Sequence, residues 1–165
     1  MAESRVIDRS RSGLWFEQFK IGDVFITPSR TVTEADNAIY CGLSGDYNPL
    51  HTDEVFASKT QFGTRIAAGL LGRMVLSGLI TRLGFLEGTA VANLELASWR
   101  FVGPILFGDT LRGEIRVLDT KLTSSASRGV VTFEMTVKNH RDELVQQGIQ
   151  KVMVHCEPQE GESNR

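Results

Sequence analysis

The sequence predicts a single α+β domain in which a curved antiparallel sheet wraps around one central apolar helix. Its 165 residues suffice for one domain with a sizeable core. Residues 67–83 are apolar on nearly every side of a helix, which is typical of a buried helix. From residue 90 onward the apolar positions recur with the strand period of two. A sheet that buries such a helix on most sides has to curve around it.

The first segments predict a turn and a strand. Residues 14–22 bring Trp15, Phe16 and Phe19 together and end in Gly22-Asp23, a typical turn pair. Residues 24–32 are rich in β-branched side chains and alternate loosely, so they predict a strand.

A short helix is expected next, over residues 34–43. Thr33 and Asp36 have the spacing of a capping box, although Asp stands where Glu or Gln is usual. The helix should end near Ser44-Gly45. Residues 45–65, which include several turn-forming residues, then predict an irregular connection.

The main helix and the strands are defined by their periods. Two apolar rows cover the helix over residues 67–83: Leu71, Val75 and Leu79, and Leu76, Ile80 and Leu83. Apolar and polar residues alternate over 111–117 and 131–137, which predicts two strands. Segments 95–102 and 144–154 predict two more, with a less regular pattern.

Composition excludes several classes of protein. A net charge of −2 without a basic stripe argues against nucleic-acid binding. Arg73 and Arg82 interrupt the most apolar stretch, which argues against a membrane span. Residues 1–13 are polar and lack the apolar core of a secretory signal. The two cysteines, Cys41 and Cys156, are interpreted as reduced thiols of a cytoplasmic protein.

These features place one domain over residues 14–156. Residues 1–13 are interpreted as a polar N-terminal tail. Residues 157–165 are interpreted as a disordered C-terminal tail, because they are short and strongly polar.

The segment that carries chemistry contains Asp46 and His51. Residues five apart are rotated by roughly 140° on a helix. On a strand they lie roughly 17 Å apart. Only a folded-back loop can bring these two side chains together, and Gly45 and Pro49 favour such a loop. A carboxylate and an imidazole held there could act on one water molecule.

Taken alone, this pair has a structural alternative, because loop Asp and His side chains more often form local hydrogen bonds. For Ser44, Asn48 and Asp53 the default interpretation is the satisfaction of backbone groups in the loop.

The complete string over residues 40–57, YCGLSGDYNPLHTDEVFA, resembles the signature of the MaoC-like, (R)-specific enoyl-CoA hydratases. In that signature Gly-Asp is followed by x-Asn-Pro, an aliphatic residue and His, here Gly45 to His51. The resemblance extends to FEQFKIGD near residue 20, FGTRIAAGLL before residue 72 and FVGPILFGDTL around residue 105. It covers most of the chain between the two tails.

The resemblance implies the hotdog fold and assigns roles to four residues. Asp46 and His51 would form the catalytic acid/base pair. Gly69, at the start of the central helix, would present its N–H to the thioester carbonyl, and Asn48 would contribute to substrate binding. Many relatives have His immediately before this glycine, whereas this chain has Ala68. That departure leaves the backbone donor in place and puts the acyl specificity in doubt.

The implied activity is the reversible hydration of a 2-enoyl-CoA to a (3R)-hydroxyacyl-CoA. Coenzyme A enters only as the carrier of the substrate, and no other cofactor is expected. His51, His140 and His155 are scattered and predict no metal site. Lys59, Arg65 and Arg73 could contact the phosphates of coenzyme A, or they could be solvated surface charges.

Two other functions compete with hydration. A hotdog thioesterase usually has a carboxylate on or beside the central helix, where this chain has none. A non-catalytic acyl-binding subunit would be expected to lack Asp46 or His51. For any of these functions we expect a homodimer or a larger homo-oligomer, because a hotdog monomer leaves one sheet edge unpaired.

Overall fold

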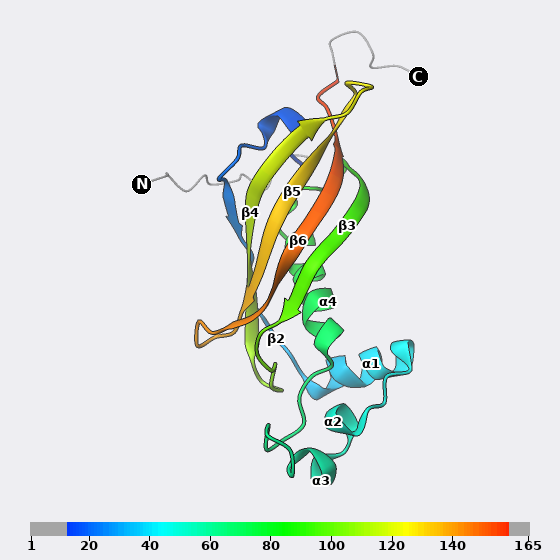
Figure 1. Cartoon of the computed structure of the whole chain (residues 1–165), viewed down its shortest axis with the longest axis vertical. Coiled ribbons are helices and arrows are strands. Elements are labelled where there is room, and N and C mark those ends of the chain that lie inside the picture. The colour runs from blue at the N-terminus through cyan, green and yellow to red at the C-terminus, as the bar shows by residue number, and fades with distance from the viewer. Residues whose placement is uncertain (1–12, 159–165) are drawn as a thin grey trace.

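The computed structural model describes residues 13–158. Figure 1 shows a long curved sheet with its helices gathered behind it and at one end. In chain order the elements are η1 (Phe16–Gln18), β1 (Val24–Ile26), β2 (Arg30–Thr31), α1 (Glu34–Ser44), α2 (Pro49–Thr52), α3 (Glu54–Ala57), α4 (Gly69–Thr81), β3 (Ala90–Phe101), β4 (Thr110–Leu122), β5 (Arg128–Lys138) and β6 (Leu144–His155).

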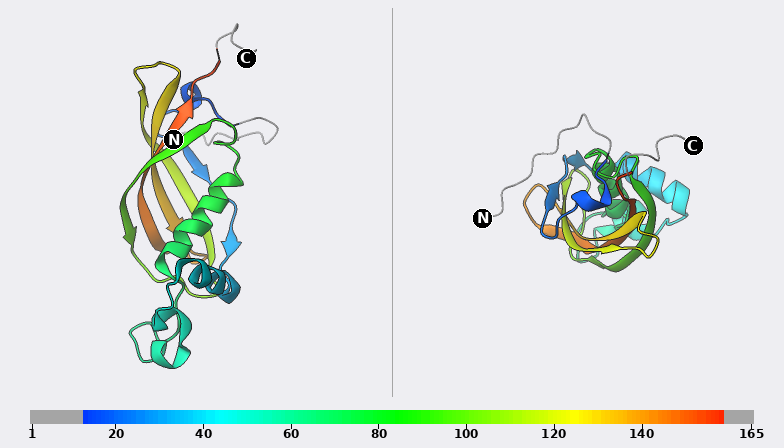
Figure 2. Two further views of the ribbon diagram at one scale, coloured as in Figure 1. Left: turned by 90° about the vertical axis from the view of Figure 1, so that its right-hand side faces the viewer. Right: turned by 90° about the horizontal axis from the view of Figure 1, so that it is seen from above.

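The sheet is antiparallel and has the order β1-β4-β5-β6-β3, with β2 also paired to β4. It curves around α4, which crosses its open face (Figure 2). This arrangement confirms the predicted α+β class and the curved sheet around one helix. The short helices α1–α3 gather at the end of the sheet where α4 begins.

The core lies between α4 and the concave face of the sheet. Leu76 and Leu79 of α4 are fully buried, as are Ile115, Val131 and Phe133 of the sheet. Leu70 and Met74, however, are each about half exposed, at 51% and 50%. The expectation that α4 is buried on nearly every side is therefore wrong for this one face, which the sheet does not reach.

Two connections differ from the sequence-based expectation. The strand expected over residues 24–32 is divided into β1 and β2, because Pro28 has no N–H to donate to the ladder. The hydroxyl of Thr27 stabilises the break by accepting the Gly113 N–H at 2.8 Å. The connection expected to be irregular over residues 45–65 contains α2 and α3, each beginning at a side-chain cap.

β3 forms one edge of the sheet. Within residues 13–158 it pairs with β6 alone, and most of its side chains are exposed on both faces. Irregularities in the pairing with β6 let the strand bend, and Ser98 there has a φ of 51°. A long edge strand with unpaired backbone groups is available to another chain.

The expected tails lie almost wholly outside the described residues, which exclude 1–12 and 159–165. Gly13, which the sequence assigned to the N-terminal tail, is buried, and its N–H donates to the carbonyl of Glu87 at 2.7 Å. No helix within residues 13–158 is both long and apolar enough to span a membrane.

Candidate active site

The loop that carries the candidate residues begins where α1 ends. The predicted capping box starts the helix: the Asp36 N–H donates to the Thr33 hydroxyl, and the Thr33 N–H donates to the Asp36 carboxylate. Gly45 ends it with a φ of 77°, a conformation that glycine adopts at little cost. The chain then turns through Asp46 into α2.

His51 is held on α2 in a defined tautomer. Its Nδ1 lies 2.9 Å from the carbonyl oxygen of Ile66. Because a carbonyl can only accept, Nδ1 is the donor and carries the proton. In the neutral imidazole the lone pair then lies on Nε2, the state that a general base requires. The side chain is partly buried.

Asp46 is exposed and held by its own loop. Its N–H donates to the Ser44 hydroxyl at 3.1 Å, and its carboxylate accepts the Asn48 N–H at 3.4 Å. Its charge acts toward α1, where burial and then the proximity of Asp46 raise the pKa of the Cys41 thiol. Within residues 13–158 no hydrogen bond joins Asp46 to His51. The structure places both on one folded-back connection, and their joint action stays a prediction.

The amino end of α4 is open. Ala68 precedes the first turn and provides no side-chain cap. Among the described residues, none accepts the Gly69 N–H, which points out of the helix start. The Gly69 carbonyl, in contrast, accepts the Gln146 side-chain amide at 2.7 Å. The Gly69 N–H, which the resemblance assigns as the oxyanion donor, therefore lies at a helix start where it is free to bind an anionic oxygen.

Gly69 and His51 border the same hollow. It has a volume of about 320 Å³ and lies between the start of α4 and the end of β3. Its wall also includes Phe62, Phe101 and Gln146. The His51 imidazole and the start of α4 therefore face one largely apolar space.

Asn37 was not predicted from the sequence. It is 4% exposed, in the middle of α1. Its carbonyl oxygen accepts the Ala68 N–H at 3.0 Å, and its NH₂ group donates to the His51 carbonyl at 3.2 Å. One buried side-chain amide thus joins α1 to His51 of α2 and to the start of α4. An Asn inside a helix is a weak signal, because Asn is unfavourable there unless its side chain is used elsewhere.

The other loop residues act locally, as their structural interpretation predicted. Asn48 caps α2 by accepting the Leu50 N–H at 3.0 Å, and Asp53 caps α3 by accepting the Phe56 N–H at 3.0 Å. Ser44 donates to the Tyr40 carbonyl at 2.8 Å. The predicted contact of Asn48 with substrate stays a prediction.

The three basic residues near the loop have different environments. Lys59 is exposed. Arg65 forms ion pairs with Glu34 at 2.9 Å and Glu54 at 3.0 Å. For Arg73 the interpretation as a solvated surface charge is wrong. Its guanidinium carbon lies 5.3 Å from the centre of the Trp99 ring, and burial lowers its pKa.

Comparison with known proteins shows the family of the chain. The MaoC like domain matches residues 17–139. The chain belongs to the MaoC-like family. It is 36% identical over 104 residues to an (R)-specific enoyl-CoA hydratase of Rhodospirillum rubrum, covering 62% of this chain and 69% of that protein. It is 35% identical over 98 residues to protein MaoC of Klebsiella aerogenes, covering 59% of this chain but only 29% of that longer protein.

Solved structures confirm the hotdog fold of this MaoC-like chain. The R-hydratase PhaJ1 of Pseudomonas aeruginosa superposes with a TM-score of 0.73 at 28% identity, covering 93% of this chain and 95% of that one. A Mycobacterium tuberculosis protein with a double hotdog fold superposes with a TM-score of 0.80 at 24% identity, covering 88% of this chain and 45% of that one. That second likeness concerns the fold alone.

Proposed function

We propose that this protein catalyses the reversible hydration of a 2-enoyl-CoA to a (3R)-3-hydroxyacyl-CoA. The observation that carries the proposal is the pairing of a Nδ1-protonated His51 with the open start of α4 at Gly69 around one hollow. Members of the family named as (R)-specific enoyl-CoA hydratases support the reaction and its stereochemistry.

The reaction requires one proton acceptor, one proton donor and a site for negative charge. The thioester carbonyl oxygen would accept the Gly69 N–H. Nε2 of His51 would take a proton from water as the water oxygen bonds to the β carbon. The electron pair of the double bond moves to form an enolate, whose charge the N–H and the helix dipole stabilise. Return of a proton to the α carbon, with Asp46 orienting the water and aiding this transfer, completes the addition.

Coenzyme A serves only as the carrier of the acyl group in this scheme. The charge that develops is met by backbone and side-chain groups of the chain itself, so the scheme uses no metal and no further cofactor.

We also propose that the active form is a homodimer. The unpaired edge of β3 carries exposed apolar side chains, among them Leu96 and Phe101. The exposed face of α4, with Leu70 and Met74, adds further uncovered apolar surface. Exposed apolar side chains gathered on an unpaired edge are typical of an interface, and two-fold pairing is the commonest closed arrangement. Light scattering of the purified protein should give twice the chain mass.

The test of the catalytic pair is a set of three nearly isosteric variants. Asp46→Asn and His51→Gln should each lower kcat for a 2-enoyl-CoA by about 10²–10⁴, the usual contribution of a positioned acid or base. The double variant should lose about as much as either single variant, because residues that act as a unit are not additive. Loss of the enoyl absorbance measures the rate. Asp53→Asn is the matched control and should lose far less, since it only caps α3.

Two outcomes would count against the proposal. Near-wild-type turnover in either single variant, with circular dichroism and dimer content unchanged, would remove the mechanism and favour an acyl-binding role. Appreciable NADH formation in a coupled assay with an (S)-specific 3-hydroxyacyl-CoA dehydrogenase would contradict the stereochemistry.

A further inference from the structure

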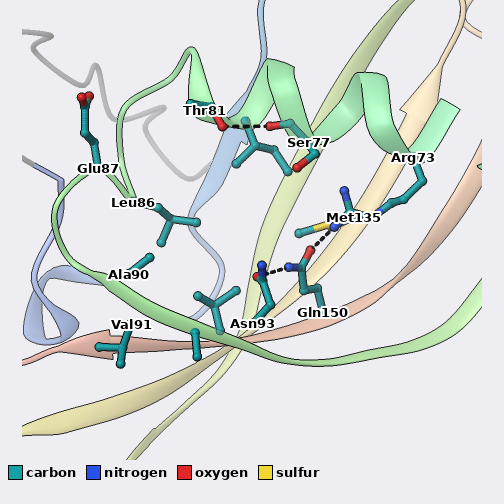
Figure 3. A pocket seen from close by; sticks show the side chains of 13 residues that line it. Arg73, Ser77, Thr81, Leu86, Glu87, Ala90, Val91, Asn93, Met135 and Gln150 are labelled. Atoms are coloured by element: carbon teal, nitrogen blue, oxygen red, sulfur yellow. Dashed lines mark hydrogen bonds between the residues drawn. The ribbon is translucent and has the colours of Figure 1, made fainter. Parts of the chain in front are cut away.

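A second hollow lies further along α4, on the same side as the first. It has a volume of about 360 Å³ between α4 and the first half of β3. Figure 3 shows Arg73 reaching from α4 toward Gln150 of β6, with Asn93 of β3 beyond it. Most of the remaining wall is apolar and includes Leu86, Met135 and Val152.

Arg73 has no carboxylate partner among residues 13–158. Its guanidinium donates to the side-chain carbonyl of Gln150, whose own NH₂ group donates to Asn93. Its Nε is buried and has no hydrogen-bond partner. Glu87 borders the same hollow but forms no ion pair with Arg73. The partly buried charge of Arg73 meets only neutral groups, the Gln150 amide and the face of the Trp99 ring, and no carboxylate among the described residues compensates it. Burial is the cause of its lowered pKa.

A comparison with Arg65 shows that acidic residues do pair with arginine elsewhere in this part of the fold. Arg65, near the start of the same helix, is satisfied by two glutamates. Arg73 lies eight residues further along the chain and lines the second hollow. Its Nε–H has no acceptor among the described residues. Such a guanidinium presents its donors in a planar fork that matches a carboxylate.

The two hollows are lined by different residues of the same three elements, α4, β3 and β6. Gly69 and Arg73 are four residues apart on α4, so they lie on one face and about 6 Å apart along the axis. On β3, Phe101 stands against Gly69 and Trp99 against Arg73, two residues apart on the same side of the strand. On β6, Gln146 borders the first hollow and Gln150 the second. An acyl group whose carbonyl is held at Gly69 and that extends along this face of α4 would bring its far end to Arg73.

We infer that the acyl group of the substrate carries a carboxylate at its far end, and that Arg73 is the residue that selects it. This inference rests on the proposed hydration at Gly69 and His51, and it names the substrate class of that site. The chemistry of the step is unchanged: water adds its hydroxyl to the β carbon and its proton to the α carbon. The carboxylate takes no part in bond making and supplies the missing partner of the guanidinium.

The experiment compares matched pairs of CoA thioesters on the wild-type dimer. Fumaryl-CoA is paired with crotonyl-CoA, and glutaconyl-CoA with 2-pentenoyl-CoA, so that each pair differs only by carboxylate against methyl. We expect kcat/KM to favour the carboxylated member of at least one pair by about 10- to 100-fold, the usual effect of a hydrogen bond to a charged group. In Arg73→Met this preference should fall to about one. Arg82→Met, which removes an exposed arginine just after the end of α4, should keep it.

A binding measurement separates this inference from the proposed hydration. Titration calorimetry of the wild-type protein with succinyl-CoA and butyryl-CoA, which cannot be hydrated, should give tighter binding of succinyl-CoA by a similar factor. Equal or tighter binding of butyryl-CoA, or equal kcat/KM within both enoyl pairs, overturns the inference while hydration stands. Selective binding of succinyl-CoA without hydration of any enoyl thioester supports the inference and removes the proposed reaction. Neither measurement on the wild type depends on the folding of a variant.

Discussion

Helices α1 and α4 begin in opposite ways although their starts lie at the same end of the molecule. The start of α1 is closed by Thr33 and Asp36, and Arg30 forms an ion pair with that same Asp36. The start of α4 has Ala68 and Gly69, which provide no side-chain cap. In a capped helix start, side chains accept hydrogen bonds from N–H groups of the first turn. An uncapped one keeps N–H groups and a partial positive charge available to a ligand.

The difference has a thermodynamic side. A polar cap is worth typically about 1 kcal/mol of stability, and α4 forgoes it at the centre of the fold. What holds the start of α4 in place is Asn37, a side chain that comes from α1 itself. A side chain of the capped helix α1 therefore holds the start of the uncapped helix α4. Under the proposed function, the missing cap is a small loss of stability at the position where a free donor is used.

The largest effect is expected from removing the free Gly69 N–H at the start of α4 without disturbing the helix. Gly69→Pro does so, because proline is tolerated at the first position of a helix and has no N–H. Ala68 already has a ψ of 137°, which a residue before proline requires. We expect kcat for enoyl-CoA hydration to fall by about 10²–10³, as for loss of an oxyanion donor.

Gly69→Ala is the matched control for that variant. It adds a Cβ about 3.1 Å from a ring carbon of Phe101, as proline also does, but it keeps the N–H. Equal losses of kcat in Gly69→Ala and Gly69→Pro would show that crowding against Phe101, not the donor, is responsible.

The next effect concerns the side chain that links the two helices. Asn37→Leu removes the hydrogen bonds to the Ala68 N–H and to the His51 carbonyl, together with a weaker one to the Cys41 sulfur. We expect a loss of about 1–3 kcal/mol in the free energy of unfolding, because buried polar groups lose their partners. We also expect kcat to fall by roughly 10- to 100-fold, because the base and the donor lose their fixed separation.

Asn139→Leu tests whether that loss of kcat is specific. Asn139 is 1% exposed and satisfies groups in the turn between β5 and β6, away from the site. Its loss should cost a comparable amount of stability and leave kcat within about two-fold of wild type. A similar fall of kcat in both variants would mean that Asn37 supports only the fold.

The smallest effect is expected at the closed helix. Thr33→Ala removes one cap and should lower the free energy of unfolding by about 1 kcal/mol, with little change in kcat. Burial opposes ionisation of Asp36, but hydrogen bonds from Thr33 and the charge of Arg30 outweigh it and lower its pKa below the usual 3.8. The resulting stability is present above that pH and is lost as the pH falls through the lower folded-state value. Acid titration followed by circular dichroism should therefore be shallower below pH 3.8 in Thr33→Ala.

Local signals explain what could be predicted from the sequence. The capping box at Thr33 and Asp36 involves residues three apart, and the alternation in β5 needs no knowledge of the partner strand. The start of α4 at Gly69 was expected from a string of fixed spacing, and the structure has it there. His51 was expected in an irregular connection, whereas the structure has it on the short helix α2.

Long-range contacts explain what could not. Asn37 bonds to Ala68 across 31 residues, and Arg73 bonds to Gln150 across 77. No pattern along the chain encodes either distance, so a buried arginine was indistinguishable from a solvated one. The helices α2 and α3 were missed because each has only four residues, too few for an apolar period to show.

Trp99 gives the second hollow a built-in optical reporter. Its indole ring is partly buried against Arg73, and its Nε1 is buried without a hydrogen-bond partner. Indole emission responds to nearby charge, so any ligand that neutralises or displaces the guanidinium changes the light that this residue emits. The sequence has only one other tryptophan, Trp15, which immediately precedes η1. Binding of a charged ligand in the second hollow should thus be measurable by the fluorescence of the unlabelled protein.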